Sequence, residues 1–209
     1  MKARIFAGVV TLALVSACVA DEHGDDHDHD NEIISRVELT FTPPGRGDVV
    51  VFAFTDPDGD GGMSGTAERI ELAAGTTYAL DIRFVNELAS PAEDLTVEIE
   101  EEAEDHMLFI LGDVMGPAST LAGALLQHAY ADLESDYGDN AVGEDLPVGL
   151  ANTITTGTAG EGQLRVVLRH LPELNGEPQK SADLPAQLAA GADLPGSVDV
   201  DVTFELVVQ

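Results

Sequence analysis

The strongest constraint on the fold is a two-residue alternation of apolar and polar side chains. The clearest example ends the chain, where one face is formed by Val198, Val200, Val202, Phe204, Leu206 and Val208. The opposite face is formed by Asp199, Asp201, Thr203 and Glu205. Successive side chains of a β-strand point to opposite sides, so this period predicts a strand with one buried face. Val37–Phe41 and Tyr78–Phe84 show the same pattern.

Other apolar runs predict further strands. They cover residues 49–54, 69–72, 107–111, 125–131, 148–155 and 164–169. Residues typical of turns separate several of the predicted strands at Pro43–Gly47, Ala74–Gly75 and Gly157–Gly162. Residues 172–196 are rich in proline, glycine and alanine, and we expect them to form a long surface loop.

One segment has helical spacing instead. Ser90 and Glu93 match a capping box, with Pro91 at the first helical position. Apolar residues follow at helical intervals, at Ala92, Leu95, Ile99 and Ala103. The pattern predicts a helix that runs to about Asp105. The predicted fold class is therefore mainly β: a single Ig-like, Greek-key β-sandwich of about 8–10 strands with one short crossing helix, formed by residues 33–209.

The N-terminus predicts export and lipid anchoring. Lys2 and Arg4 precede an apolar run, Ile5–Val15, that is too short to span a bilayer. The run ends at Val-Ser-Ala-Cys, which resembles the lipobox of bacterial lipoproteins and implies cleavage after residue 17 and acylation of Cys18. The alternative is an ordinary secretory signal. We expect residues 1–17 to be the signal peptide and the acidic residues 18–32 to form a disordered arm between lipid and domain.

The charge balance excludes several kinds of partner. The chain has 39 acidic and 9 basic residues, a formal net charge of −30, and a single cysteine. Such a surface repels nucleic acid and anionic headgroups, so we expect no nucleic-acid partner and membrane contact only through the acyl chains. A second cysteine is absent, so the exported domain must fold by core packing or with help from bound ions.

Two acidic loops are candidate calcium sites. Asp56, Asp58 and Asp60 alternate as in the front half of a calcium loop, and Gly62 and Ser64 can add a carbonyl and a water-linked hydroxyl. The back half of that motif does not match, and the alternative is a solvated turn. A weaker, irregularly spaced candidate is the loop with Asp132, Glu134, Asp136 and Asp139.

The end of the predicted helix is a candidate for another metal. Acidic residues crowd this end, where the helix macrodipole already places negative charge. Glu98, Glu102 and His106 recur every four residues, and a divalent cation bridging them would relieve the repulsion. The alternative is that His106 is a hydrogen-bonded, half-buried histidine whose protonated form the helix end favours.

Histidines also occur in the arm and in two predicted strands. His23, His27 and His29 stand among aspartates and can collect zinc or copper loosely. The alternative is that the arm is only a charged spacer. His128 and His170 are single histidines, and we expect both to be structural. The chain has no GxSxG, HExxH or P-loop motif, so we predict no catalysis and no organic cofactor.

The order of several blocks resembles a known family. These blocks are DPDGDGG, ERIELAAGTTYALDIRFVNE, EIEEEAEDH, PVGLANTITTG, QLRVVLRH and VDVDVTFELVV. They resemble small exported bacterial lipoproteins that are often described as type 1 periplasmic binding fold proteins. That description implies a two-lobed α/β fold, which the two-residue period contradicts. The resemblance carries over no catalytic residue, and it mildly favours ligand capture beside an outer-membrane uptake system.

The predicted function is therefore binding at the cell envelope. We expect an outer-membrane lipoprotein, on the periplasmic or cell-surface face, that binds cations: structural calcium in the Asp56–Asp60 loop, and zinc or copper at the arm. Its expected partners are an outer-membrane receptor or another envelope protein. The alternative is an adhesion or interaction module that binds protein or glycan through the end loops of the sandwich.

Overall fold

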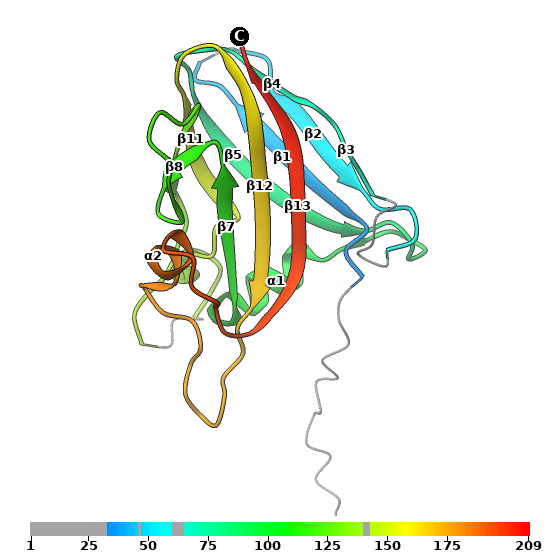
Figure 1. Ribbon diagram of the computed structural model, residues 1–209. Helices are drawn as coiled ribbons and strands as arrows, with labels where there is room; N and C mark the ends of the chain where they lie inside the picture. Colours follow the sequence, from blue (N-terminus) through cyan, green and yellow to red (C-terminus); the bar gives the residue numbers. More distant parts are fainter. Residues whose placement is uncertain (1–32, 46, 60–64, 140–142) are drawn as a thin grey trace, which may run out of the picture. The chain divides into compact units, whose positions relative to one another are not determined.

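Two β-sheets enclose one apolar core and form a β-sandwich (Figure 1). The computed structural model describes residues 33–45, 47–59, 65–139 and 143–209. The first sheet has the order β3 (Thr66–Ala67), β2 (Val50–Thr55), β1 (Arg36–Thr42), β5 (Thr77–Asn86), β11 (Ala151–Thr156), β10 (Leu126–Tyr130), β8 (Val114–Gly116) and β9 (Ser119–Thr120), with β6 (Glu93–Asp94) paired to β5. The second sheet has the order β4 (Ile70–Leu72), β13 (Ser197–Val208), β12 (Gly160–His170) and β7 (His106–Gly112).

The predicted mainly β sandwich is confirmed. Within the described residues, ten strands have three or more residues and three have only two. Every strand segment predicted from the sequence overlaps an observed strand, whereas β3, β6, β8 and β9 are too short to show an alternation. The pairs β8–β10 and β4–β13 are parallel, so the sheets are mixed and depart from the antiparallel pairing typical of Ig-like sandwiches.

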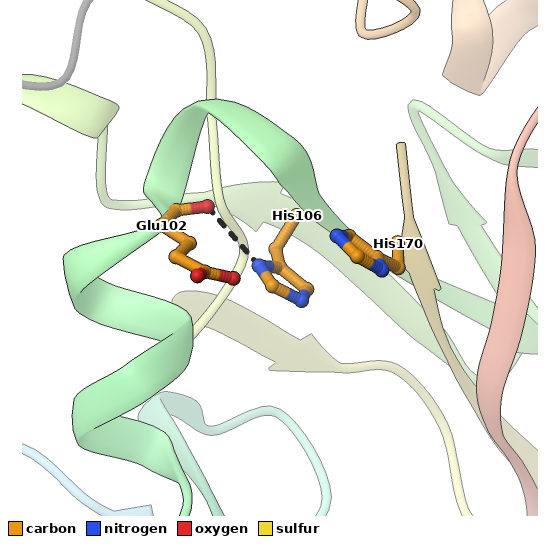
Figure 2. Close-up of side chains that lie close together, drawn as sticks. All are labelled: Glu102, His106 and His170. Carbon is orange, nitrogen blue, oxygen red and sulfur yellow. Dashed lines mark hydrogen bonds between the residues drawn. The ribbon is translucent and has the colours of Figure 1, made fainter. Parts of the chain in front are cut away.

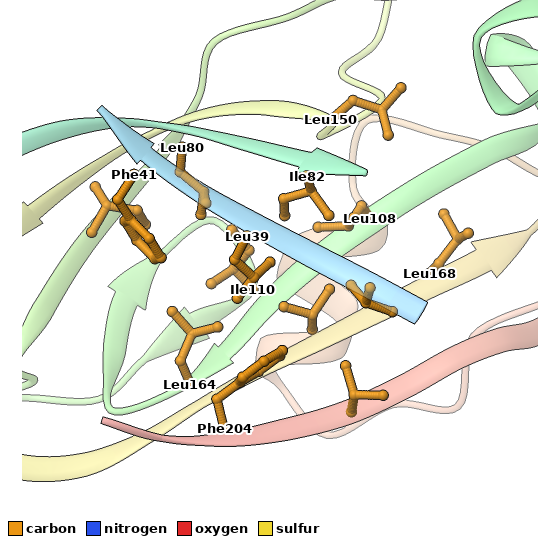
Figure 3. Packing of buried hydrophobic residues seen from close by; sticks show 14 of the residues in the cluster. Leu39, Phe41, Leu80, Ile82, Leu108, Ile110, Leu150, Leu164, Leu168 and Phe204 are labelled. Atoms are coloured by element: carbon orange, nitrogen blue, oxygen red, sulfur yellow. The ribbon is translucent and has the colours of Figure 1, made fainter. Parts of the chain in front are cut away.

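The alternating apolar faces form the core between the sheets (Figure 3). The first sheet contributes Leu39 and Phe41 from β1 and Leu80 and Ile82 from β5, among others. The second sheet contributes Ile110 from β7, Leu164 from β12 and Phe204 from β13, among others. Burying one such side chain contributes about 1.5–3 kcal/mol, so this shared core is the main interaction that holds the two sheets together.

Strand β7 is buried on both faces. Leu108 and Ile110 point into the main core, whereas Met107 and Phe109 pack in a second apolar cluster outside the sheet. Helix α2 (Leu184–Ala189) covers that second cluster and contributes Leu184 to it. The prediction that residues 172–196 form only a surface loop was therefore wrong, because a short amphipathic helix in this segment covers β7.

The predicted helix is shorter and starts later than expected. Helix α1 spans Thr96–Glu101, and a 3₁₀ turn, η1 (Ala103–Asp105), follows it. The predicted N-terminal box is wrong, because the helix begins only at Thr96 and Glu93–Asp94 pair with β5 as β6. Thr96 ties the first turn to the sheet instead, because its hydroxyl accepts the Phe84 N–H at 2.9 Å.

The phase of the last strand changes near its start. A β-bulge interrupts the pairing of β12 and β13, so that Leu168 pairs with Val200 and Arg169 with Val198. The extra residue on β13 is Asp199, and Val198 is 44% exposed. The strict alternation predicted Val198 inside, which was wrong because the bulge shifts the side-chain phase by one residue.

The described residues include no helix long and apolar enough to cross a bilayer. Residues 1–32, which contain the predicted signal peptide, Cys18 and the arm histidines His23, His27 and His29, lie outside the part of the chain that the structure describes.

Candidate metal centre

The second sheet and the end of α1 bring three candidate metal ligands together. His106 is the first residue of β7 and His170 the last of β12, and the two are direct partners in the antiparallel ladder. Glu102 is the C-cap of α1, one short turn before His106. Figure 2 shows the three side chains in a row, with His106 between the other two. We call Glu102, His106 and His170 the histidine cluster.

The two imidazole rings are stacked. Their centroids are 4.8 Å apart and their planes differ by 9°. One ligand atom from each of Glu102, His106 and His170 lies within 4.8 Å of the other two. A tetrahedral ion with bonds of about 2.0–2.1 Å holds its ligand atoms about 3.3 Å apart, so the side chains must rotate toward one another to bind it.

A hydrogen bond fixes the orientation of His106. Its Nδ1 lies 3.0 Å from the backbone carbonyl oxygen of Glu102 (Figure 2). Since a carbonyl only accepts, Nδ1 carries the proton and Nε2 presents its lone pair. A hydrogen bond from the second ring nitrogen to a carbonyl or carboxylate is the usual support of a metal-binding histidine.

Burial keeps the His106 ring neutral. The residue is 3% exposed, and desolvation lowers its pKa from 6.5 to about 4. The carbonyl of Glu102 opposes this shift, while the charges of His170 and Lys180 add to it. The expectation that the helix end favours protonated His106 was therefore wrong, because desolvation outweighs the favourable end of the helix. A neutral imidazole is the form that binds metal ions.

Asp105 and Asp199 both interact electrostatically with His170. Burial raises the pKa of Asp105 and of Asp199, and the charge of His170 opposes the shift in both cases. Repulsion from Glu104, Glu102 and Glu173 raises the pKa of Asp105 further. Two acidic groups thus lie near His170, and the donor set of the histidine cluster, two imidazoles and one carboxylate, suits zinc, copper or nickel.

Glu98, the third member of the predicted helical set, lies apart from this cluster. Its side chain is exposed. Within the described residues, the single group of three with the spacing of metal ligands is the histidine cluster, in which His170 stands in place of Glu98. The helical interval of four therefore identified Glu102 and His106, and it could not identify a ligand from another strand.

The predicted second acidic loop does not bring its carboxylates together. Asp132 is buried, and it accepts the backbone N–H groups of Gly149, Leu150 and Ala151 and the hydroxyl of Tyr137. The other three have separate surroundings: Glu134 pairs with Lys180, Asp136 accepts the Leu133 N–H, and Asp139 is exposed. The Asp132 carboxylate therefore accepts hydrogen bonds that hold this loop, and it does not form a calcium site with the other three residues.

Lys180 relieves the crowding of charge after α1. Its Nζ lies 2.7 Å from Glu134 Oε1, and it donates a hydrogen bond to the backbone carbonyl of Ala103 at 2.7 Å. A cation near a helix C-terminus is favourable. The positive charge that reduces the repulsion among the acidic residues after α1 thus comes in part from Lys180, which is 77 positions from Ala103 along the chain.

The predicted calcium loop is described only at its start. Asp56 follows β2 and is 1% exposed, and Asp58 is exposed. Asp60, Gly62 and Ser64 lie outside the described residues. His128, expected to be structural, has its Nε2 2.8 Å from the Asn152 side-chain oxygen inside the first sheet.

His170 is the cluster residue that sequence analysis missed. It was expected to be structural because nothing near it in the sequence suggests a ligand. The available signal was the pairing of QLRVVLRH with the strand that begins at His106, which places the two histidines opposite each other. Comparison with known proteins adds no family, because no family model and no curated protein matches this chain.

Proposed function

We propose that this chain is a non-catalytic, lipid-anchored envelope protein that binds cations, and that the histidine cluster holds a transition-metal ion. The observation that carries the metal part is the convergence of Glu102, His106 and His170, with the His106 tautomer fixed by the Glu102 carbonyl. The anchor is supported by the lipobox-like residues before Cys18.

Two properties of the cluster support a metal ion over a purely structural histidine pair. The His106 ring is neutral, so it needs no proton to be displaced when a metal binds. The carboxyl groups of Asp105 and Asp199 interact electrostatically with His170, and nearby negative charge favours a bound cation.

The test is a zinc titration of residues 33–209, followed by calorimetry and by metal analysis after dialysis. We expect one site, and we expect His170→Ala and Glu102→Gln each to weaken it about 10-fold or more. Glu98→Gln is the matched control, because it removes the same charge from the same helix outside the cluster. A titration in which Glu98→Gln and Glu102→Gln weaken binding equally would contradict the assignment.

The arm is tested separately. Residues 18–209 with Cys18→Ser should bind more zinc or copper than residues 33–209, and the additional ions should be lost when His23, His27 and His29 are replaced. If both lengths bind the same amount, the arm is only a spacer.

The lipid anchor is tested in cells. Labelled palmitate should be incorporated into the full-length chain and not into Cys18→Ser, and the unmodified variant should be released from the membrane fraction. Incorporation into Cys18→Ser would contradict acylation at this residue.

A further inference from the structure

A cavity lies beside η1, and none of the three histidine cluster residues lines it. Its volume is about 350 Å³. The residues that line it include four acidic ones, Glu104, Asp105, Glu134 and Glu173, together with Lys180. These residues come from η1, from η2 (Glu134–Asp136) and from the segment after β12, so three parts of the chain meet around one strongly acidic space.

The ion pair in its wall leaves carboxylate oxygens without a donor. Lys180 and Glu134 are each 2% exposed at the side chain, and they are joined through Glu134 Oε1. The second oxygen of Glu134, Oε2, and Oε2 of Glu104 are buried and have no hydrogen-bond partner among the described residues. A buried carboxylate oxygen without a donor is costly, so these two atoms favour a ligand that brings N–H groups.

The carboxylates are not arranged for a bare metal ion. Across the described residues, the histidine cluster is the single group of three with the spacing of metal ligands, and no cavity residue belongs to it. Hard cations need several oxygens that converge on one point at about 2.0–2.6 Å, and the described cavity residues form no such group. A ligand of several atoms can reach acidic groups that do not converge on one point.

We propose that this cavity binds a small organic cation through a primary ammonium group, which donates to Glu134 and Glu104. The volume lies in the range of small-molecule sites, about 300–1,000 Å³, and far exceeds that of a single water, about 30 Å³. The remaining walls include Leu146, Pro172 and Pro178, which offer apolar contacts to the carbon chain of such a ligand.

The test is calorimetry with putrescine on residues 18–209 carrying Cys18→Ser, in the presence of EDTA so that the histidine cluster is free of metal. Butane-1,4-diol is the neutral control of equal length. We expect putrescine to bind and the diol not to bind. Glu104→Gln should weaken binding about 10-fold or more, because a charge-assisted hydrogen bond is lost.

Glu98→Gln is again the matched control, because it lies outside the cavity and should leave the putrescine affinity unchanged. Glu134→Gln is a second variant, checked by circular dichroism because it also breaks the buried ion pair with Lys180. Equal binding of the diol, no binding of putrescine, binding of calcium in its place in EDTA-free buffer, or no effect of Glu104→Gln would each overturn the proposal.

Discussion

His106 is the residue whose environment differs most from the one expected at a helix end. Its pKa falls from 6.5 to about 4 on burial, so between these values the unfolded state binds more protons than the folded state. The contribution of His106 to stability is complete above the unfolded pKa and is lost as the pH falls toward 4. From about pH 7 to about pH 5, the free energy of unfolding should fall by about 2 kcal/mol because of this residue alone.

The measurement is a urea titration of metal-free residues 33–209 at both pH values, compared with His106→Gln. The variant lacks the titrating ring, so its stability should fall less over the same interval. Asp105 and Asp199 have raised pKa values, so they increase the free energy of unfolding as the pH falls. This effect is present in both proteins, so the difference between their pH dependences reports on His106. Equal pH dependence in the two proteins would show that the ring is not buried in its neutral form.

Asp132 is an internal acceptor that holds a loop. Its carboxylate accepts three backbone N–H groups and the Tyr137 hydroxyl, and the residue is 4% exposed. Asp132→Ala should lower the free energy of unfolding by about 3 kcal/mol or more, because these donors lose their acceptor. Asp139→Ala, at an exposed site in the same loop, should stay within about 0.5 kcal/mol in the same urea titration. If the two variants lose equal stability, the assigned role of Asp132 is wrong.

The spacing of residues in the sequence identified candidate metal ligands that lie close together along the chain, and it did not identify a ligand from a distant strand. Glu102 and His106 were predicted from a helical interval, and both belong to the histidine cluster. His170 was not, because its approach to His106 depends on the register of two strands whose paired residues are 52 to 64 positions apart in the sequence. Local spacing contains no information about that register until both strands and their partners are known.

The Thr96 hydroxyl helps to attach helix α1 to the first sheet, beside the hydrogen bond from the Leu95 N–H to the Phe84 carbonyl. Thr96 accepts the Phe84 N–H at 2.9 Å and donates to the Phe84 carbonyl at 3.3 Å. Thr96→Val keeps the shape and removes both bonds, so it should lower the free energy of unfolding by about 1–2 kcal/mol in chemical denaturation. The control is Thr77→Val, which removes an exposed hydroxyl contact with Thr155 and should change stability by less than about 0.5 kcal/mol. Similar losses would contradict the attachment.

Strands were more predictable than helices, for a physical reason. In a half-buried strand, apolar and polar side chains alternate at every residue, so even five residues such as Val37–Phe41 are enough to predict a strand. Both helices have only six residues, less than two turns, and neither has a side-chain hydrogen bond at its N-cap. The unbroken apolar run at Met107–Leu111 did indicate that another element packs on the outer face of the sheet. A strand that is apolar on both faces must be covered on both, and α2 covers the outer face.

Charge is the property that acts on the whole molecule. With a net charge of −30, mutual repulsion of carboxylates opposes folding, and the exposed pairs that Arg69, Arg83 and Arg165 make with acidic residues contribute little. The sandwich could be predicted because burial of apolar faces outweighs this repulsion. The function could not, because ligand sites in this chain depend on contacts between distant segments.

Repulsion of this size predicts a melting temperature that rises with sodium chloride, since the screening length falls to about 10 Å near 0.1 M salt.

Calcium chloride at equal ionic strength should raise the melting temperature of residues 33–209 further, because an ion bound only by the folded Asp56–Asp60 loop adds stability by mass action. Asp58→Ala should lose the calcium excess and keep the sodium response, whereas Asp48→Ala, an equal loss of charge at another exposed site, should keep both. Equal rises with the two salts in the unsubstituted domain would reject the calcium loop, and no rise with sodium chloride would reject charge repulsion as the destabilising force.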